Sequence, residues 1–412
     1  MSASAPARAE PRSSRITDPE NSPELELLLA CAHRNLSAEC ARRARELLNQ
    51  PLDWSRLFEQ GQAHGLLPLL HWHGTRTLAL DLPQKIAQSL HERFRANAAR
   101  NLLLIEELSN IVNLLGGGGI AAVPFKGPAL AERLYGDAAL RECVDLDILV
   151  RARDVPDAIR TLVSAGYEPG LKLNAAQQNA LVASQYEYAL LSPAGTLVEL
   201  QWSIVPRCFS LSLPEEQYWS HVRSLTIGGR KMNELSAEDL LLLLVFHGGK
   251  HGWEKLIWVA DVAELMAANP RMDWAYVLDR AQRTGGVRML LLAVLLANRL
   301  LGSPLPRELD AGLDRDRTVA QIAADICCKL VRGEYPTYLQ TQLYLLRVRE
   351  RWQDRLRYVA RFTLTATPME WGMADFPRPF FFLYRGLRVL RGLGKARALA
   401  TNVAARVIKA KV

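Results

Sequence analysis

Apolar residues recur at helical spacing over much of the first 115 residues. The pattern is clearest in LELLLACA, GLLPLLHWH and AQSLHERFRANAARNLLLIEELSNIVNLL, and such a period predicts helices with one buried face. Asp53, directly before Trp54, is a favourable N-cap. Four glycines at 116–119 end the last helix, because glycine is favoured just past a helix C-terminus. We therefore predict a helical region over residues 23–115. The Ser-, Ala- and Pro-rich residues 1–22 before it predict a disordered tail.

The period changes to alternation in the segment VDLDILV. Asp145 and Asp147 fall on one face of the predicted strand, and the other face carries four aliphatic residues, Val144, Leu146, Ile148 and Val150. The two carboxylates start about 7 Å apart and can converge on one hard cation or on two neighbouring ions. Burying unpaired acids is costly, so a metal site is the functional interpretation. A solvated strand edge is the alternative.

A second acid-x-acid pair serves as an internal comparison. Asp314 and Asp316 lie in LDRDRT, between helical segments and beside arginines. No apolar alternation surrounds them, so we interpret this pair as a solvated, salt-bridged loop. Only the first pair is placed on a strand by its neighbours.

Two β-rich runs follow the predicted acid strand. QYEYALLS and GTLVELQWSI are joined by Pro193-Ala194-Gly195, which predicts a hairpin. Glu199 lies on the polar side of the second run and can join the two aspartates as a third acid; a solvent-facing glutamate is the alternative. SLTIGGRKMNEL predicts another hairpin, with Gly228-Gly229 at its turn. Together these segments predict a core domain over residues 116–235.

The chain becomes helical again over residues 236–365, after Ser236 as an N-cap. Within it, HGGKHGWEK contains His247, Lys250 and His251 on one predicted helix. HGGKH lacks the glutamate of a zinc-protease motif, which excludes that class. The three side chains could donate to a phosphate group. A polar network at a helix end is the alternative.

Length and composition limit the classes of protein to which the chain can belong. A chain of 412 residues can bury a sizeable core. Its six cysteines show neither metal-ligand spacing nor the density of a disulfide scaffold, which indicates a reducing cytosol. No secretory signal and no spanning helix is predicted. A GxxxxGK[ST] loop is absent, which excludes a P-loop nucleotide-binding enzyme.

The net charge of +8 is concentrated at one end, since nine basic residues and no acid lie between Phe376 and Val412. Residues 366–412 therefore form a basic extension, and leucines at helical spacing make residues 380–411 amphipathic. Such a helix suits an anionic membrane surface, with nucleic acid as a rival partner. A helix that docks on the protein's own core is the third interpretation. We expect a cytoplasmic protein, attached peripherally to the inner membrane if the extension binds lipid.

These motifs resemble the uncharacterised nucleotidyltransferase family of the DNA polymerase β superfamily. The similarity spans roughly residues 25–300. The segments that carry it are Phe125-Lys126-Gly127, Tyr135, Arg141, the Asp145-x-Asp147 strand, VELQW and HGGKHGWEKLIWVADVAEL. The resemblance implies an α+β fold in which a small mixed sheet with flanking helices, the polymerase β-like nucleotidyltransferase core, lies between helical N- and C-terminal regions.

The resemblance also implies roles for individual residues. Asp145, Asp147 and Glu199 would be the catalytic and metal-binding acids, with Mg²⁺ or Mn²⁺ as the cofactor. Nucleotide-binding residues would include Lys126, Gly127 and Arg141, and those of the later helix, Lys250, His247 and His251. The implied reaction transfers a nucleotidyl group from a nucleoside triphosphate to a hydroxyl acceptor of unknown identity.

Two other functions stay open at this point. The same acids could serve a phosphotransferase that moves the γ-phosphate. Pro128 and Gln201 depart from the usual family pattern, and proline removes one N–H that could donate to phosphate. A module that binds a nucleotide with little or no turnover is therefore the second alternative.

Overall fold

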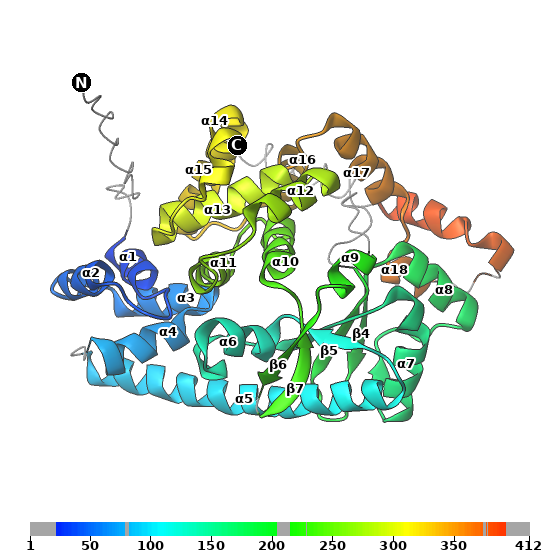
Figure 1. Cartoon of the computed structure of the whole chain (residues 1–412), viewed down its shortest axis with the longest axis horizontal. Coiled ribbons are helices and arrows are strands. Elements are labelled where there is room, and N and C mark those ends of the chain that lie inside the picture. The colour runs from blue at the N-terminus through cyan, green and yellow to red at the C-terminus, as the bar shows by residue number, and fades with distance from the viewer. Residues whose placement is uncertain are drawn as a thin grey trace, which may run out of the picture.

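The computed structural model describes residues 22–78, 82–203, 215–227, 229–373, 376 and 378–392. The predicted N-terminal tail lies outside this range, apart from Ser22, which caps the first helix. Residues 393–412 of the basic extension lie outside it too. Figure 1 shows a mixed sheet between helices of the N-terminal and C-terminal regions, so the α+β fold class is confirmed.

The central sheet has five strands in the order β1-β2-β5-β4-β3. They are β1 (Ala122–Pro124), β2 (Asp145–Val150), β3 (Glu168–Pro169), β4 (Glu187–Leu191) and β5 (Leu197–Gln201). β2 and β5 run parallel, and every other pair in this sheet is antiparallel. The β4–β5 hairpin turns at Gly195, as its sequence predicts. β6 (Arg223–Ile227) and β7 (Arg230–Glu234) form the second predicted hairpin.

Five α-helices and a short π-helix, η1 (His73–Thr77), build the described part of the N-terminal region. The α-helices are α1 (Pro23–Ala30), α2 (Ala38–Leu48), α3 (Trp54–His64), α4 (Leu67–Trp72) and α5 (Gln84–Gly117). The Asp53 carboxylate accepts hydrogen bonds from the backbone N–H groups of Ser55 and Arg56, which confirms the predicted cap of α3. In Figure 1, α5 runs beneath α4, α6 and the sheet. This long helix therefore joins the N-terminal region to the sheet.

Helices flank the strands and form the C-terminal bundle. Beside the strands lie α6 (Gly127–Tyr135), α7 (Val155–Ser164), α8 (Ala175–Ser184) and α9 (Glu215–Trp219). The bundle contains α10 (Ala237–Lys250), α11 (Leu256–Ala268), α12 (Trp274–Thr284), α13 (Val287–Leu301), α14 (Asp310–Arg315), α15 (Arg317–Arg332), α16 (Tyr338–Arg347), α17 (Trp352–Leu364) and α18 (Pro368–Trp371). Ser236 Oγ accepts from the N–H of Asp239, so the predicted cap of α10 is confirmed.

The two faces of β2 contribute to different apolar clusters. Leu146 and Ile148 pack into a cluster with residues of α5 and α7. Leu149, on the same side as the two aspartates, belongs to the cluster that fills the helical regions. The acidic face of the strand is therefore turned toward the helical bundle.

The strand itself differs from the prediction in one respect. Val144 was expected on the buried aliphatic face, but it precedes the strand and is 71% exposed. The apolar alternation in the sequence begins at Val144, one residue before the hydrogen-bonded ladder. The sequence pattern alone therefore predicts a strand that is one residue too long. The ladder from Asp145 to Val150 fixes the actual start.

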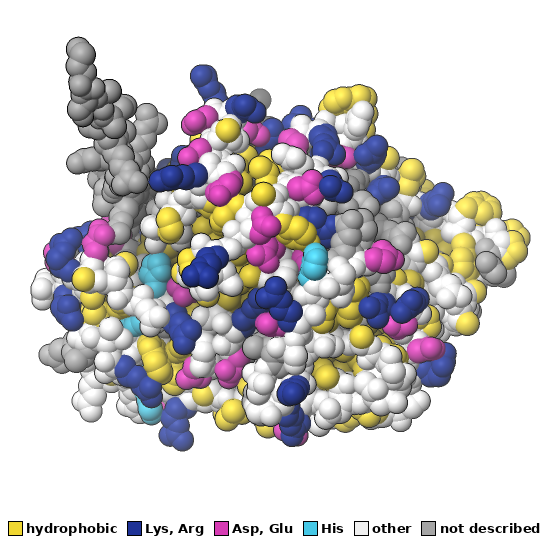
Figure 2. All heavy atoms as spheres, viewed as in Figure 1, with side chains coloured by type: hydrophobic (Ala, Val, Ile, Leu, Met, Phe, Trp, Pro, Cys, Tyr) yellow, Lys and Arg dark blue, Asp and Glu magenta, His cyan; other side chains and the backbone are white. Residues whose placement is uncertain are grey.

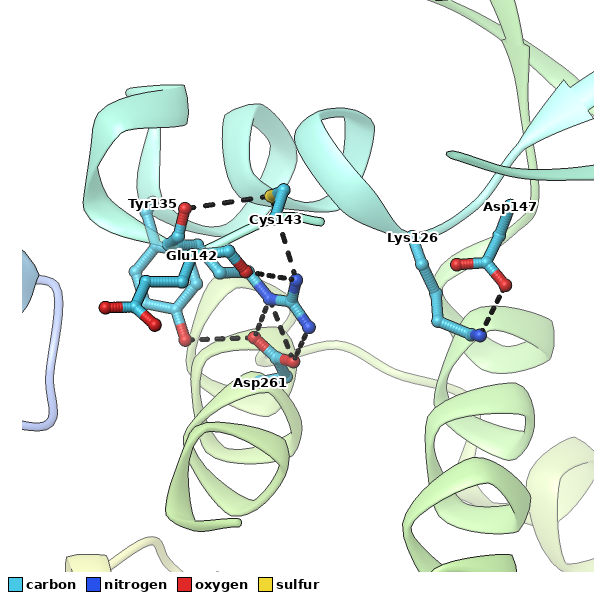
Figure 3. A network of polar contacts seen from close by, with 7 residues as sticks. Lys126, Tyr135, Glu142, Cys143, Asp147 and Asp261 are labelled. Atoms are coloured by element: carbon cyan, nitrogen blue, oxygen red, sulfur yellow. Dashed lines mark hydrogen bonds and ion pairs between the residues drawn. The ribbon is translucent and has the colours of Figure 1, made fainter. Parts of the chain in front are cut away.

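A buried ion pair connects the chain before β2 to the bundle. Arg141 donates to both carboxylate oxygens of Asp261 in α11, with Nη2 2.9 Å from Oδ2 and Nε 3.1 Å from Oδ1. The Tyr135 hydroxyl donates to the same carboxylate over 3.1 Å (Figure 3). Asn101 in α5 donates to the Arg141 carbonyl over 2.8 Å. α5 thus holds the backbone of Arg141 and α11 holds its guanidinium, while Tyr135 of α6 supports the Asp261 carboxylate.

The described part of the basic extension packs on the protein. Residues 383–392 are helical, the Tyr384 side chain is buried, and Arg391 forms a 2.6 Å ion pair with fully buried Glu370. Docking on the protein's own core was one of the three interpretations. Figure 2 shows basic and acidic side chains interspersed on the face in view. No helix among the described residues is long and apolar enough to cross a membrane. A peripheral membrane role stays a prediction.

The ion pair between Arg141 and Asp261 generates a stability prediction. Asp261→Asn leaves the buried guanidinium without its counter-charge, so we expect the free energy of unfolding to fall by about 3–5 kcal/mol. Urea denaturation followed by circular dichroism measures the change. Asp157→Asn, which removes an exposed ion pair with Arg160, is the control and should cost about 0.5 kcal/mol or less. Equal losses of unfolding free energy in the two variants would show that breaking the buried pair costs no more than breaking the exposed one.

Candidate active site

Three predicted acids lie side by side on the sheet. Asp147 in β2 is the register partner of Glu199 in β5, and neighbouring strands are about 4.8 Å apart. Partners in register project from the same face, and Asp145 shares that face because it lies two residues before Asp147. Asp147 is 3% exposed, while Asp145 and Glu199 are half-buried. The structure therefore brings these residues together.

Two side chains donate to Asp147 directly. Lys126 Nζ lies 2.6 Å from Oδ1, and Figure 3 shows its chain extending toward this carboxylate. Gln201 Nε2 donates to the same oxygen over 2.7 Å and to Glu199 Oε2 over 3.2 Å. Gln201 thus bridges the two strands, and Lys126 supplies the nearest positive charge to Asp147.

Gly127 begins α6 against the acid strand. Its φ of +58° is in the left-handed region, which glycine adopts without the penalty that a Cβ brings. A Cβ at this position would lie 2.9 Å from the backbone oxygen of Asp145. The sequence KGP therefore places the N-terminus of a helix, where N–H groups favour an anion, directly beside the acids.

Sequence reasoning missed a fourth acid, Glu187. It is the register partner of Gln201 across the β4–β5 hairpin, so it shares the face of Glu199. Its neighbour Tyr186 accepts a hydrogen bond from Lys250 Nζ over 3.1 Å. The only signal in the sequence is the position of Glu187 in a strand joined by a short turn to that of Glu199.

Crowding of acids changes their protonation. Burial raises the pKa of Glu199 to about 7, with further contributions from Asp147 and Glu187. Burial, followed by the charge of Asp147, also raises the pKa of Asp145. Negative charge therefore exceeds what Lys126 offsets, and the cluster is suited to receive additional positive charge.

The later helix brings the predicted basic residues toward the acids. α10 continues through Gly248-Gly249 and ends at Lys250. Burial lowers the pKa of Lys250, and Glu187 acts in the opposite direction. His247 and His251 pack on each other with ring centroids 4.9 Å apart. Burial, then Lys250, lowers the pKa of His251 to about 3, so the ring is neutral at pH 7.

Arg141 does not point at a carboxylate of the sheet. Both edges of its guanidinium are directed at Asp261 and nearby backbone, although its charge offsets a small part of the rise in the Asp145 pKa that burial and Asp147 cause. In the second acid-x-acid pair, Asp316 caps α15 and forms a 2.6 Å ion pair with Arg288. Asp314 is exposed at the end of α14, a helix where we expected a loop.

The acid cluster has the chemistry, but not the convergent geometry, of a cation site. Among the described residues, no group of three or more His, Cys, Asp or Glu side chains converges on one metal position. The chemistry of the donor set is nevertheless that of a hard cation, because carboxylate oxygens suit Mg²⁺. The Lys126 ammonium group already lies against the Asp147 carboxylate, which would also attract a divalent cation. By chemistry, Asp145, Asp147 and Glu199 fit a divalent cation.

Comparisons with known proteins point to one family. The profile of a family described as "Uncharacterised nucleotidyltransferase" matches residues 50–302. No curated protein matches the chain. Among solved structures, an antigenic nucleotidyltransferase-like protein from Paracoccidioides brasiliensis is similar at 15% identity and a TM-score of 0.28, covering 57% of this chain and 95% of the other. That structural similarity is too low to carry an argument.

The approach of Gly127 to the acid strand generates a second prediction. Gly127→Ala adds left-handed strain, about 1 kcal/mol or more, and also forces the new methyl group against Asp145. Gly119→Ala is the matched control, since its φ is +73° and nothing lies within 4 Å of the added Cβ. We expect Gly127→Ala to cost at least twice the unfolding free energy of Gly119→Ala in urea titrations. Equal costs would show that the strand tolerates the methyl group.

Proposed function

Because the chain belongs to the uncharacterised nucleotidyltransferase family, we propose that it transfers a nucleotidyl group from a nucleoside triphosphate to a hydroxyl acceptor, with Mg²⁺ as the cofactor. One observation carries the proposal. Asp147 and Glu199 are partners across parallel strands, with Asp145 on the same face and the N-terminus of α6 alongside. Nucleotidyl transfer requires chiefly positioning and charge neutralisation, which such a site supplies.

The acids would hold the cofactor. Asp145, Asp147 and Glu199 are the residues that would bind Mg²⁺, as hard oxygen ligands on one face of the sheet. When bound, the ion supplies positive charge to the phosphate oxygens of the substrate. Gln201, by donating to both Asp147 and Glu199, would keep the carboxylates of the two strands in position.

Cationic groups of the chain would bind the triphosphate. Lys126 precedes α6 and reaches the acid face, so a phosphate near this helix meets both its ammonium and the free N–H groups of the first turn. Lys250, held by Tyr186, approaches from α10. The two lysines thus reach the acid cluster from different elements.

Glu199 would accept the proton of the attacking hydroxyl. Its carboxylate is in register with Asp147 across the parallel strands, so it would lie beside an acceptor hydroxyl that binds at the acid face. The proton would pass from the acceptor oxygen to a Glu199 carboxylate oxygen as the oxygen attacks the α-phosphorus and pyrophosphate leaves.

A module that binds a nucleotide without turnover is the second candidate. Pro128 at the start of α6 removes one N–H from the helix end. Gln201 Nε2 occupies an oxygen of both Asp147 and Glu199. The missing N–H and the occupied carboxylate oxygens both favour nucleotide binding without transfer. The assay below distinguishes this function from nucleotidyl transfer.

Labelled nucleotides test the proposed reaction. The protein is incubated with Mg²⁺, cell extract as acceptor, and ATP labelled at the α or the γ position. We expect transfer of the α label, whereas transfer of the γ label alone would indicate a phosphotransferase. Asp145→Asn, Asp147→Asn and Glu199→Gln should each reduce transfer at least about 100-fold, because each replaces a charged metal ligand with a neutral side chain of the same shape.

Asp314→Asn is the matched control for the acids, since Asp314 also belongs to an acid-x-acid pair but is exposed. It should transfer label at the wild-type rate. Retained nucleotide binding with no transfer of either label would support the binding module. Near wild-type turnover in Asp147→Asn would remove the assignment of the acids.

Substitution of Lys250 distinguishes a contact with the nucleotide from a purely structural role. Burial opposes its charge, so Lys250→Ala should change the melting temperature little. Loss of a charged donor to phosphate should raise the Kd for ATP about tenfold or more, measured by isothermal titration calorimetry. Lys255→Ala, at an exposed position, is the control and should bind normally. A lower melting temperature with unchanged ATP affinity would assign Lys250 to the bundle's internal polar network.

A further inference from the structure

The outer side of α17 carries an apolar stripe. Trp352, Leu356 and Val359 are 66%, 60% and 48% exposed, and their spacing of four and three residues places them on one side of the helix. The other side of α17 faces the protein through Asp354 and Tyr358, which are buried. A surface helix normally turns its apolar stripe toward the core. The stripe of α17 is turned toward solvent instead.

A second group of exposed apolar side chains adjoins α17. Phe382 and Leu390 are exposed, and residues 383–392 form the last described helix. Arg388 of this helix donates from Nε and Nη2 to the carbonyl oxygen of Phe362 in α17, over 3.3 and 3.2 Å. In Figure 1 the two helices lie along the upper-right edge of the molecule, and Figure 2 shows hydrophobic side chains at this edge with basic ones between them. We call this surface the C-terminal face; its apolar residues are Trp352, Leu356, Val359, Phe382 and Leu390.

The charge exposed around these side chains is positive. From Arg351 to Gly392 the sequence has eight arginines and three acids. Two of the acids, Asp354 and Glu370, are buried, and Asp375 lies outside the described residues. Arg355 and Arg385 are among the exposed arginines. The described part of this segment therefore presents apolar side chains and positive charge to solvent, and no carboxylate.

Two occupants that come from this chain would meet charge of the same sign. Residues 393–412 contain five basic residues and no acid, so contact between them and the C-terminal face would bring positive charges together. A second copy that presented the same face, as in a two-fold symmetric dimer, would do the same. Like charges opposed across an interface are unfavourable. Charge complementarity therefore favours a negatively charged partner.

The apolar side chains distinguish between anionic partners. Nucleic acid offers phosphates to the arginines and a stacking surface to aromatic rings, but it offers little to the aliphatic side chains of Leu356, Val359 and Leu390. A bilayer that contains anionic lipid offers headgroup charge to arginine and an acyl boundary to aromatic and aliphatic side chains. Tryptophan is also enriched at the boundary between lipid and water. The composition of the C-terminal face thus fits a lipid surface better than a nucleic acid.

We propose that the C-terminal face docks on the surface of a membrane that contains anionic lipid. The stripe of α17 enters the boundary between headgroups and acyl chains, and Phe382 and Leu390 enter beside it. The exposed arginines lie at the level of the anionic headgroups. α17 lies in the plane of the membrane surface, as amphipathic interfacial helices do. This docking is independent of nucleotidyl transfer, since it uses none of the acids of the sheet.

Lipid vesicles test the proposal. Full-length protein is mixed with phosphatidylcholine vesicles, with or without about one-third phosphatidylglycerol, and bound protein is separated by flotation. We expect binding to the anionic vesicles at about 0.05 M salt, and binding to the neutral vesicles that is at least about tenfold weaker. At about 0.5 M salt the difference between the two vesicles should largely disappear, because salt screens the headgroup charge.

Apolar substitutions locate the binding on the C-terminal face. Trp352→Ser combined with Leu356→Ser removes two side chains that enter the lipid, so it should weaken binding to anionic vesicles at least about tenfold. The matched control is Leu102→Ser combined with Leu103→Ser. These two leucines are 67% and 73% exposed, but they lie on α5, along the lower edge of the molecule in Figure 1. The control should bind as the wild type does, and the two double variants should have similar melting temperatures.

A charge substitution tests the role of the arginines. Arg385→Gln should weaken binding to anionic vesicles about fivefold, as expected for one basic residue near an anionic surface, and should leave binding to neutral vesicles unchanged. Arg42→Gln is the control, because Arg42 is also exposed but lies on α2, at the opposite end of the molecule in Figure 1. It should retain the wild-type affinity.

Several outcomes would overturn the proposal. Absence of flotation with anionic vesicles removes the membrane partner, and flotation that Trp352→Ser with Leu356→Ser leaves intact places the binding elsewhere. Binding of a labelled oligonucleotide in place of vesicles, weakened by Arg385→Gln, would assign the face to nucleic acid. A dimer in sedimentation equilibrium that the double variant dissociates would assign it to a second copy. If the double variant fails to fold, equal vesicle affinities of Arg385→Gln and Arg42→Gln would still contradict the docking.

Discussion

The buried ion pair between Arg141 and Asp261 is the contact on which the placement of the acids depends. Arg141 lies four residues before Asp145, and its backbone carbonyl is held by Asn97 and Asn101 of α5. Its guanidinium is held by α11. The chain therefore enters β2 at a position fixed by the long N-terminal helix and by the bundle together. A buried pair of this kind contributes little net stability, but removing one partner is severe, so it acts as a strict constraint on geometry.

That constraint has an electrostatic consequence at the sheet. With β2 fixed, the β2–β5–β4 register gathers Asp147, Glu199 and Glu187 on one face, and burial raises the pKa of Glu199 and Glu187. Lys126 and Lys250 approach from α6 and α10 and offset part of the charge. The surplus of negative charge makes the face receptive to a cation. A divalent cation, the cofactor that we propose for this chain, would balance that charge.

Features set by neighbouring residues could be predicted from the sequence, whereas features set by pairing could not. The caps at Asp53 and Ser236 and the turn at Gly195 depend on a few adjacent residues, and the structure has them as predicted. Glu187 was missed because its side depends on register with another strand. Likewise, the partner of Arg141 is 120 residues away in sequence, and no local pattern identifies it.

The turn after α10 links the acid face of the sheet to the interior of the helical bundle. Lys250 reaches toward the sheet through Tyr186, and three residues later the fully buried Trp253 belongs to the apolar cluster that fills the helical regions. The Trp253 ring fills the space that a side chain at Gly248 would need, and the Trp253 N–H donates to the Gly248 carbonyl over 3.0 Å. The end of the helix and the indole are therefore packed as one unit. Because Lys250 lies between Gly248 and Trp253 in this unit, a change at either of those residues would also shift the cation that faces the acids.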